Sequence, residues 1–337
     1  MSTVRRSLSE ERSDETKGPE LVEGTQALGS LSAESDPVPE RGASFVSLRS
    51  LRNRDEGRPA STGAASGSRI RLIATDLDGT LLDPTGHVTA RSRAALDAAR
   101  AAGIVVVPVT ARQPIGLRAI AAEAGFAGWA LCGNGAYGIH LGTHEQLFAS
   151  EIAVPVQQRI ARELAAQVPD LLFASVREAG EVFVAQAGYA EVAALGDHKR
   201  DPRTMGAVPL TEVLLAPSLK LVVRHASISP AEIFAVLGTL DQTGFAATLS
   251  GAPFVEVMAE GVTKASGLAL LCAELGIEQD EVLAFGDALN DVEMLRWAGH
   301  GVAMANAEPA ALAAADEVTA SNAADGVAAV LERVLAV

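Results

Sequence analysis

The sequence is poor in cysteine, has no long hydrophobic run and lacks an excess of positive charge. Cys132 and Cys272 are the only cysteines among 337 residues, and no Cys-x-x-Cys motif occurs. Neither a disulfide framework nor a zinc site is therefore expected, and both cysteines are predicted to be small core residues. Such sparse use of cysteine fits the reducing cytoplasm, where we expect the protein to reside.

The hydrophobic stretches are all short. No uninterrupted apolar run reaches the roughly 20 residues that a transmembrane helix needs. The first six residues, MSTVRR, contain paired arginines but lead into serine and glutamate, so we do not expect an export signal. We predict that the protein has no membrane partner.

Acidic residues outnumber basic ones, 42 to 27, which gives a formal net charge of −15. Proteins that bind nucleic acid neutralise phosphates with lysine and arginine, so this charge balance argues against a nucleic-acid partner. The hydrophobic content of 48% is enough for one large domain or two medium domains with real cores. We expect a monomer or a homodimer.

Residues 1–68 differ in composition from the rest of the chain. They are rich in Ser, Glu, Arg, Gly and Pro, contain few large apolar residues and show no sustained period. Such a segment cannot bury enough apolar surface to offset its conformational entropy. We predict a disordered N-terminal tail.

From residue 69 the sequence alternates between predicted strands and helices. The apolar run over residues 72–74 is too short for a helix and fits a buried parallel strand. A helix over residues 90–102 and a strand over residues 104–109 complete a strand–helix–strand unit. Further elements are predicted over residues 115–125, 129–132, 264–275, 282–285, 292–298, 301–304, 309–314 and 326–335. The fold class is therefore α/β, a doubly wound parallel sheet of the Rossmann-like kind, which binds ligands beyond the carboxyl ends of its strands.

The pattern changes between residues 154 and 259. A helix followed by paired strands occurs twice there, which is typical of an α+β unit with an antiparallel sheet. The predicted helices cover residues 155–168 and 230–242, and the predicted strands cover residues 171–176, 181–187, 218–224, 245–249 and 254–258. We therefore predict a tail (1–68), a core in two parts (69–153 and 260–337) and an inserted domain (154–259).

Two carboxylates directly follow the first predicted strand. Asp76 and Asp78 lie two residues apart, so on an extended chain their side chains point the same way. Carboxylates brought together in this way repel each other and favour a divalent cation, and oxygen ligands suit Mg²⁺. Gly79 allows the chain to turn sharply after the pair. The sequence therefore predicts a magnesium site at the end of this strand.

Four other polar residues are expected near the same edge of the sheet. Thr110 follows the second predicted strand, Lys264 begins a predicted helix, and Asp287 and Asp291 follow a later strand. Taken alone, Thr110 could be a capping hydroxyl and Lys264 a solvated helix residue. Together with Asp76 and Asp78, they stand at strand ends or helix starts in an order that resembles the active-site motifs of a known phosphohydrolase family.

These motifs resemble those of the haloacid dehalogenase-like phosphohydrolases. The first family motif is matched by residues 76–82 (DLDGTLL), and the resemblance covers residues 71–337. It is closest to the Cof-type subfamily, in which a cap domain is inserted between the second and third motifs. Matching segments are residues 109–112 (VTAR), 134–136 (NGA), 263–264 (TK), 285–287 (FGD) and 290–291 (ND). Ala288 and Ala305 depart from the family pattern, but both are small and leave the ligand atoms in place.

The resemblance implies a role for each matching residue. Asp76 would be the nucleophile that forms an aspartyl-phosphate, and Asp78 the acid/base that protonates the leaving oxygen. Thr110 would donate a hydrogen bond to the phosphoryl group, and Lys264 would place its charge beside it. The implied Mg²⁺ cofactor is assigned to Asp76, Asp78, Asp287 and Asp291, and the implied substrate-binding residues are Arg112, Asn134, Gly135 and Asn290. A structural ion pair is the alternative for Arg112.

The expected function is hydrolysis of a small phosphomonoester such as a sugar phosphate, flavin mononucleotide or pyridoxal phosphate. The cap should exclude water and select the leaving group. Within the insertion no residue identifies the substrate, and polar residues such as Glu256 are only loose candidates for contacts. Two alternatives stay open. One is a phosphomutase or phosphotransferase that uses the same intermediate, and the other is a non-enzymatic metabolite-binding protein.

Overall fold

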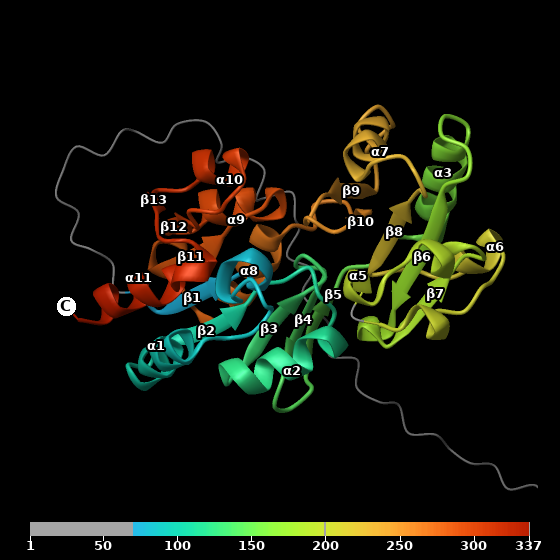
Figure 1. Ribbon diagram of the computed structural model, residues 1–337. Coiled ribbons are helices and arrows are strands. Elements are labelled where there is room, and N and C mark those ends of the chain that lie inside the picture. The colour runs from blue at the N-terminus through green and yellow to red at the C-terminus, as the bar shows by residue number, and fades with distance from the viewer. Residues whose placement is uncertain (1–69, 199, 337) are drawn as a thin grey trace, which may run out of the picture. The chain divides into compact units, whose positions relative to one another are not determined.

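The computed structural model describes residues 70–198 and 200–336 (Figure 1). The tail predicted over residues 1–68 lies outside these residues. Within the described ranges, no helix has both the length and the apolar character needed to cross a bilayer.

A five-stranded parallel sheet forms the centre of the core (Figure 1). The strand order is β13-β12-β11-β1-β2. The strands are β1 (Leu72–Thr75), β2 (Val105–Pro108), β11 (Val282–Gly286), β12 (His300–Ala303) and β13 (Glu317–Val318). In register, Ala74 of β1 pairs with Ala284 of β11 and with Val107 of β2. All four residues of β1 are buried, as expected for a strand covered on both faces.

Helices pack against both faces of this sheet. Ile73 belongs to a cluster with Leu96 and Leu331, whereas its neighbour Leu72 belongs to a cluster with Leu268 and Met294. Alternate residues of β1 therefore face different helix layers, as the pleat of a strand requires. The helices of the core are α1 (Ala90–Ala101), α2 (Pro114–Ala124), α8 (Lys264–Leu275), α9 (Val292–Trp297), α10 (Pro309–Ala314) and α11 (Gly326–Leu335). The prediction of a doubly wound α/β fold is confirmed.

A small antiparallel sheet follows β2 and was not predicted in full. It contains β3 (Trp129–Cys132), β4 (Tyr137–His140) and β5 (Gln146–Ala149). Only β3 was expected, because residues 137–149 contain glycine and histidine and show little alternation. Gly138 lies where a Cβ would come within 2.8 Å of the Phe148 ring, so close packing between β4 and β5 explains this glycine.

A second five-stranded sheet is formed by residues between 172 and 259, and it is antiparallel. Its order is β7-β6-β8-β10-β9, and α3 and α7 contribute to its apolar cluster through Ile160 and Ile233. The elements are α3 (Val154–Ala165), β6 (Leu172–Arg177), β7 (Val182–Ala185), α4 (Tyr189–Val192), α5 (Leu195–His198), α6 (Leu210–Val213), β8 (Lys220–Arg224), α7 (Pro230–Leu237), β9 (Phe245–Thr248) and β10 (Val255–Ala259). We propose that the cap covers residues 154–259, since this sheet lies entirely within that range.

Candidate active site

Asp76 stands at the carboxyl end of β1, and the backbone of the core fixes its position. Its N–H donates to the carbonyl of Phe285 on β11 (3.0 Å), which continues the parallel pairing by one residue. The chain then turns at Gly79, where φ is +83°. A Cβ at this position would lie 2.2 Å from Oδ2 of Asp287. Glycine is therefore required both by the backbone conformation and by the carboxylate that lies against it.

Lys264 is buried between two carboxylates. Its Nζ donates to Oδ1 of Asp76 and to Oδ1 of Asp291, each at 2.6 Å. Thr263 caps α8, with its side chain accepting from the N–H of Ser266, and so fixes the first helical residue, Lys264. Burial lowers the pKa of Lys264, but Asp291 and Asp76 more than compensate, and the pKa lies above its usual value. Lys264 is therefore a permanent positive charge beside Asp76.

Three carboxylates form a compact acidic group. Asp76, Asp287 and Asp291 each offer an oxygen, and these oxygens lie within 4.8 Å of one another. Burial raises the pKa of Asp76 well above its usual value, despite the opposing effect of Lys264. Burial also raises the pKa of Asp287 to about 6, while a hydrogen bond from Thr80 Oγ1 (2.8 Å) opposes the rise. A cation among these oxygens would relieve the cost of ionising them, so the group fits a hard divalent metal.

Asp291 also accepts hydrogen bonds from the backbone of the loop that follows β11. Its Oδ2 accepts from the N–H groups of Asp287 and Ala288, both at 3.0 Å, while Oδ1 accepts from Lys264. These bonds hold the loop after β11 in a fixed shape and thereby orient Asp287. Gly286 makes room for this arrangement, because a Cβ there would lie 2.4 Å from Cβ of Asp291.

Asp78 and Arg112 form a bidentate ion pair. Arg112 Nε lies 2.7 Å from Asp78 Oδ2, and Nη2 lies 2.5 Å from Oδ1. The structure thus shows the ion pair that was the alternative for Arg112, and because Arg112 also lines the cavity, its binding of substrate stays a prediction. The main-chain N–H of Arg112 also donates to Oγ1 of the buried Thr110 (3.1 Å). The carboxylate of Asp78 is not part of the three-carboxylate group and instead lines the adjoining cavity.

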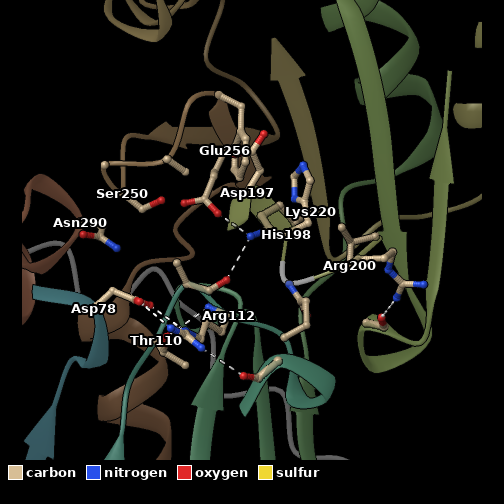
Figure 2. Close-up of a pocket in the computed structure, with 18 of the residues that line it drawn as sticks. Asp78, Thr110, Arg112, Asp197, His198, Arg200, Lys220, Ser250, Glu256 and Asn290 are labelled. Carbon is tan, nitrogen blue, oxygen red and sulfur yellow. Dashed lines mark hydrogen bonds and ion pairs between the residues drawn. The ribbon is translucent and has the colours of Figure 1, made fainter. Parts of the chain in front are cut away.

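A cavity of about 390 Å³ opens beside these residues (Figure 2). Its core wall includes Asp76, Asp78, Thr110, Arg112 and Asn290. Its other wall comes from residues between 176 and 256 and includes Phe183, His198, Lys220, Phe254 and Glu256. Two carboxylates, a hydroxyl group and a guanidinium group of the core therefore face a space large enough for a small metabolite.

Comparison with known proteins agrees with this geometry. The family described as haloacid dehalogenase-like hydrolase matches residues 73–331. The chain belongs to this family. YxeH of Bacillus subtilis (strain 168) is 32% identical over 279 residues, which cover 79% of this chain and 99% of YxeH. The HMP-PP phosphatase of Serratia proteamaculans (strain 568) is 30% identical over 244 residues, 71% of this chain and 85% of that protein.

A solved structure gives the same assignment. BT1666 from Bacteroides thetaiotaomicron, whose structure is described among phosphatases of the haloalkanoate enzyme superfamily, aligns with a TM-score of 0.68 and 26% identity. The alignment covers 82% of this chain and 100% of BT1666. The predicted family, its α/β core and a hydrolase function are confirmed by these matches.

Two of the predicted substrate-binding residues of this haloacid dehalogenase-like hydrolase do not line the cavity. Asn134 instead donates to Glu256 and accepts from Asn290. Gly135 has φ +88°, and a Cβ there would lie 2.3 Å from the carbonyl oxygen of Thr263. Close approach of the loop to the start of α8 explains this glycine, and substrate contact by Gly135 stays a prediction.

The sequence did not reveal how the hydrolase builds the cap wall of its cavity. Lys220 begins the apolar strand β8 and is nevertheless buried. In the sequence, the only indication of a buried lysine was a charged residue at the start of an apolar run. His198 stacks on Phe254, with ring centroids 4.5 Å apart, and accepts or donates a hydrogen bond with Tyr189 (2.7 Å). No short sequence motif marks these contacts.

Proposed function

We propose that this hydrolase is a Mg²⁺-dependent phosphomonoesterase that acts on small phosphorylated metabolites through an aspartyl-phosphate at Asp76. The observation that carries the proposal is the meeting of Lys264 with Asp76 at 2.6 Å beside a group of three carboxylates. A nucleophilic carboxylate with a fixed ammonium on one side and room for a metal on the other suits attack on a phosphate ester. The phosphatase names of related proteins support the same reaction class.

In the first step an oxygen of Asp76 attacks phosphorus. A bond forms between that oxygen and phosphorus while the bond from phosphorus to the leaving alcohol oxygen breaks. Asp78, on the wall of the cavity, would leave its ion pair with Arg112 as the substrate phosphate binds, take up a proton from solvent and give that proton to the leaving oxygen. The products of this step are a free alcohol and the aspartyl-phosphate.

In the second step water replaces the enzyme at phosphorus. Asp78, now a carboxylate, takes a proton from the water as the water oxygen attacks. The bond between phosphorus and Asp76 breaks, which releases inorganic phosphate and restores both carboxyl groups to their starting forms. The same residue thus serves as acid and then as base.

Positive charge and hydrogen-bond donors stabilise the phosphoryl group in both steps. Mg²⁺, when bound, supplies charge to the phosphoryl oxygens, and Asp76, Asp287, Asp291 and the main-chain carbonyl of Asp78 would hold it. Lys264 adds a second charge, and Thr110 places its hydroxyl at the cavity wall.

Phosphate release tests the proposal. The protein is incubated with p-nitrophenyl phosphate and with a panel of phosphorylated metabolites, with Mg²⁺ or with a chelator. We expect turnover that requires the metal and is lost in the Asp76→Asn variant, which preserves shape but removes the nucleophilic charge. Metal-independent turnover, or an Asp76→Asn variant with wild-type rate, contradicts the proposal.

The same assay separates the alternative acceptors. A phosphotransferase or phosphomutase would release less free phosphate when a second sugar is added, because the sugar would take the phosphoryl group in place of water. A metabolite-binding protein without activity would release none from any compound. We expect free phosphate to equal the alcohol released, with or without the added sugar.

A further inference from the structure

The charged side chains that line the cavity are almost all neutralised by a partner of opposite charge. Four ion pairs account for them: Asp76–Lys264, Asp78–Arg112, Asp197–Arg224 and Glu256–Lys220. His198 also lines the cavity, but burial lowers its pKa to about 3 and leaves its ring uncharged near neutral pH. Among the described residues, the charged side chain of the cavity wall that stands outside these pairs is Arg200.

The contacts of Arg200 with the described part of the chain are to neutral groups. Its Nη2 donates to the main-chain carbonyls of Gly180 (3.1 Å) and Glu181 (3.4 Å), in the turn between β6 and β7. Its guanidinium carbon lies 5.5 Å from the centre of the Phe183 ring. Carbonyl dipoles and the face of a ring can position a guanidinium, but they carry no net charge. The positive charge of Arg200 is therefore not neutralised by these contacts.

Most of the hydrogen-bond donors of Arg200 are unused. A guanidinium group has five N–H donors, and only Nη2 donates to described residues. Neither Nε nor Nη1 is among the described side-chain atoms that are buried without a partner. Since these two nitrogens make no hydrogen bond to described residues either, their N–H groups lie on accessible surface and can donate to a ligand. Such a forked set of donors matches the oxygens of a carboxylate or a phosphate group.

The turn that holds Arg200 rests on the core. Gly180 has φ +89°, and a Cβ there would lie 2.4 Å from Cβ of Gln113, which belongs to the core and also lines the cavity. Ala179, the preceding residue, packs against an apolar cluster of the core. These contacts hold Arg200 at a defined place relative to the catalytic residues. Figure 2 shows Arg200 across the cavity from Asp78.

We propose that Arg200 binds a second anionic group, carried by the leaving part of the substrate, and thereby selects phosphate esters of hydroxy acids and bisphosphates over phosphate esters of neutral alcohols. This rests on the proposed phosphatase function and narrows its substrate class. The scissile phosphoryl group lies at the end of the cavity with Asp76 and Lys264, and the second anion lies at the end with Arg200.

The charge balance of the cavity explains the selectivity. A neutral leaving group would displace water from Arg200 without offering it a partner, and an unpaired charge that loses its water is costly. An anionic group would instead accept charge-assisted hydrogen bonds from Nε and Nη1. Hydrogen bonds to charged groups of this kind correspond to a difference of about 10- to 100-fold in kcat/KM.

The test uses pairs of compounds that differ in a single group. In the pair 3-phosphoglycerate and glycerol 3-phosphate, and in the longer pair 6-phosphogluconate and glucitol 6-phosphate, a carboxylate replaces a hydroxymethyl group. In the pair fructose 1,6-bisphosphate and fructose 6-phosphate, a second phosphate replaces a hydroxyl group. Each compound is measured as a substrate, by phosphate release, and as a competitive inhibitor of p-nitrophenyl phosphate hydrolysis.

We expect the wild-type protein to prefer the acidic member at least tenfold in one or more pairs. A preference confined to the first two pairs identifies a carboxylate as the group that Arg200 binds, and a preference confined to the fructose pair identifies a phosphate. The two chain lengths show how far from the scissile phosphoryl group the second anion lies.

Two variants separate binding by Arg200 from support of the turn. Arg200→Gln can still donate to the carbonyl of Gly180 but has no charge, so the preference for the acidic member should fall about 10- to 100-fold, mainly through KM. Arg200→Lys keeps the charge without the forked donors and should retain part of the preference. A residue that only supports the turn would change both members of a pair by the same factor. Thermal denaturation of each variant shows whether it folds.

The matched control is Arg118→Gln, which removes a positive charge beside the same turn. Arg118 of α2 pairs with Glu181 (2.6 Å), its side chain is 68% exposed, and it does not line the cavity. Hydrolysis of p-nitrophenyl phosphate and the preference within each pair should both match the wild type. An unchanged preference in Arg200→Gln, or a wild-type protein that hydrolyses p-nitrophenyl phosphate but prefers no acidic member, would overturn the inference. Failure of the wild-type protein to hydrolyse p-nitrophenyl phosphate would instead contradict the proposed function itself.

Discussion

Replacing Gly79 by alanine tests whether the turn after Asp76 is shaped around Asp287. A Cβ at Gly79 would lie 2.2 Å from Oδ2 and 2.8 Å from Cγ of Asp287. The carboxylate is held from its other oxygen by Thr80, whose Oγ1 donates to Oδ1 at 2.8 Å. The new methyl group would therefore push the carboxylate away and break the hydrogen bond from Thr80.

A matched substitution at Gly86 separates the cost of the backbone conformation from the cost of the contact with Asp287. It has nearly the same backbone conformation (φ +85° against +83°), but a Cβ there would meet nothing within 4 Å. Gly86→Ala should lower the free energy of unfolding by about 1–2 kcal/mol, the cost of placing a side chain in the left-handed region. Gly79→Ala should lose roughly a further 1.5–3 kcal/mol, the contribution of a hydrogen bond to a charged group.

The assay combines urea denaturation with a Mg²⁺ titration of p-nitrophenyl phosphate hydrolysis. Displacement of Asp287 should raise the Mg²⁺ concentration for half-maximal rate about tenfold or more in Gly79→Ala, since loss of a positioning contact typically costs that much in metal affinity. Gly86→Ala should need the same Mg²⁺ concentration as the wild type. If the two variants behave alike in both measurements, the turn does not position Asp287 and the reasoning is wrong.

Two further variants test the electrostatics of the buried groups. Lys264→Met leaves Asp76 and Asp291 buried without their ammonium, so we expect the free energy of unfolding to fall by about 3–5 kcal/mol at pH 8. Because burial raises the pKa of Asp76, protonation of Asp76 at lower pH relieves part of this cost, and we expect a smaller loss at pH 5. Equal losses in urea denaturation at both pH values would contradict this. Burial lowers the pKa of His198 to about 3. Below about pH 6.5 the unfolded chain therefore binds a proton at this residue that the folded protein does not bind. The free energy of unfolding consequently falls as the pH drops from about 6.5 toward 3. His198→Gln should flatten this fall by at most about 1.4 kcal/mol per pH unit, and an unchanged slope would refute the assignment.

The site residues at strand ends could be predicted because the local sequence pattern and the parallel topology of the sheet place them at the same edge. The apolar run of β1 leads directly into Asp76, and the parallel sheet brings the loop after β11 to the same edge. The structure places Lys264 within hydrogen-bond distance of Asp76, although 188 residues separate them in sequence. The arrangement follows from the rule that parallel strands end at a common edge.

The cap wall could not be predicted, because its contacts depend on tertiary packing alone. A buried lysine such as Lys220 looks like any strand-end lysine until its partner Glu256 is known. The pairing of Arg112 with Asp78 had the same ambiguity, since an arginine near a phosphate site can bind substrate or a carboxylate equally well. The β4–β5 hairpin was missed because its glycine and histidine residues hide the period of a strand.

Chemical trapping of the phosphorylated enzyme tests the nucleophilic role of Asp76 most directly. Borohydride reduces an acyl phosphate to an alcohol, so an aspartyl-phosphate at position 76 becomes homoserine, which mass spectrometry of the peptide detects. We predict this conversion at residue 76 during turnover of p-nitrophenyl phosphate, and none in Asp76→Asn. Conversion at a different residue, or wild-type turnover by Asp76→Asn, would contradict the account.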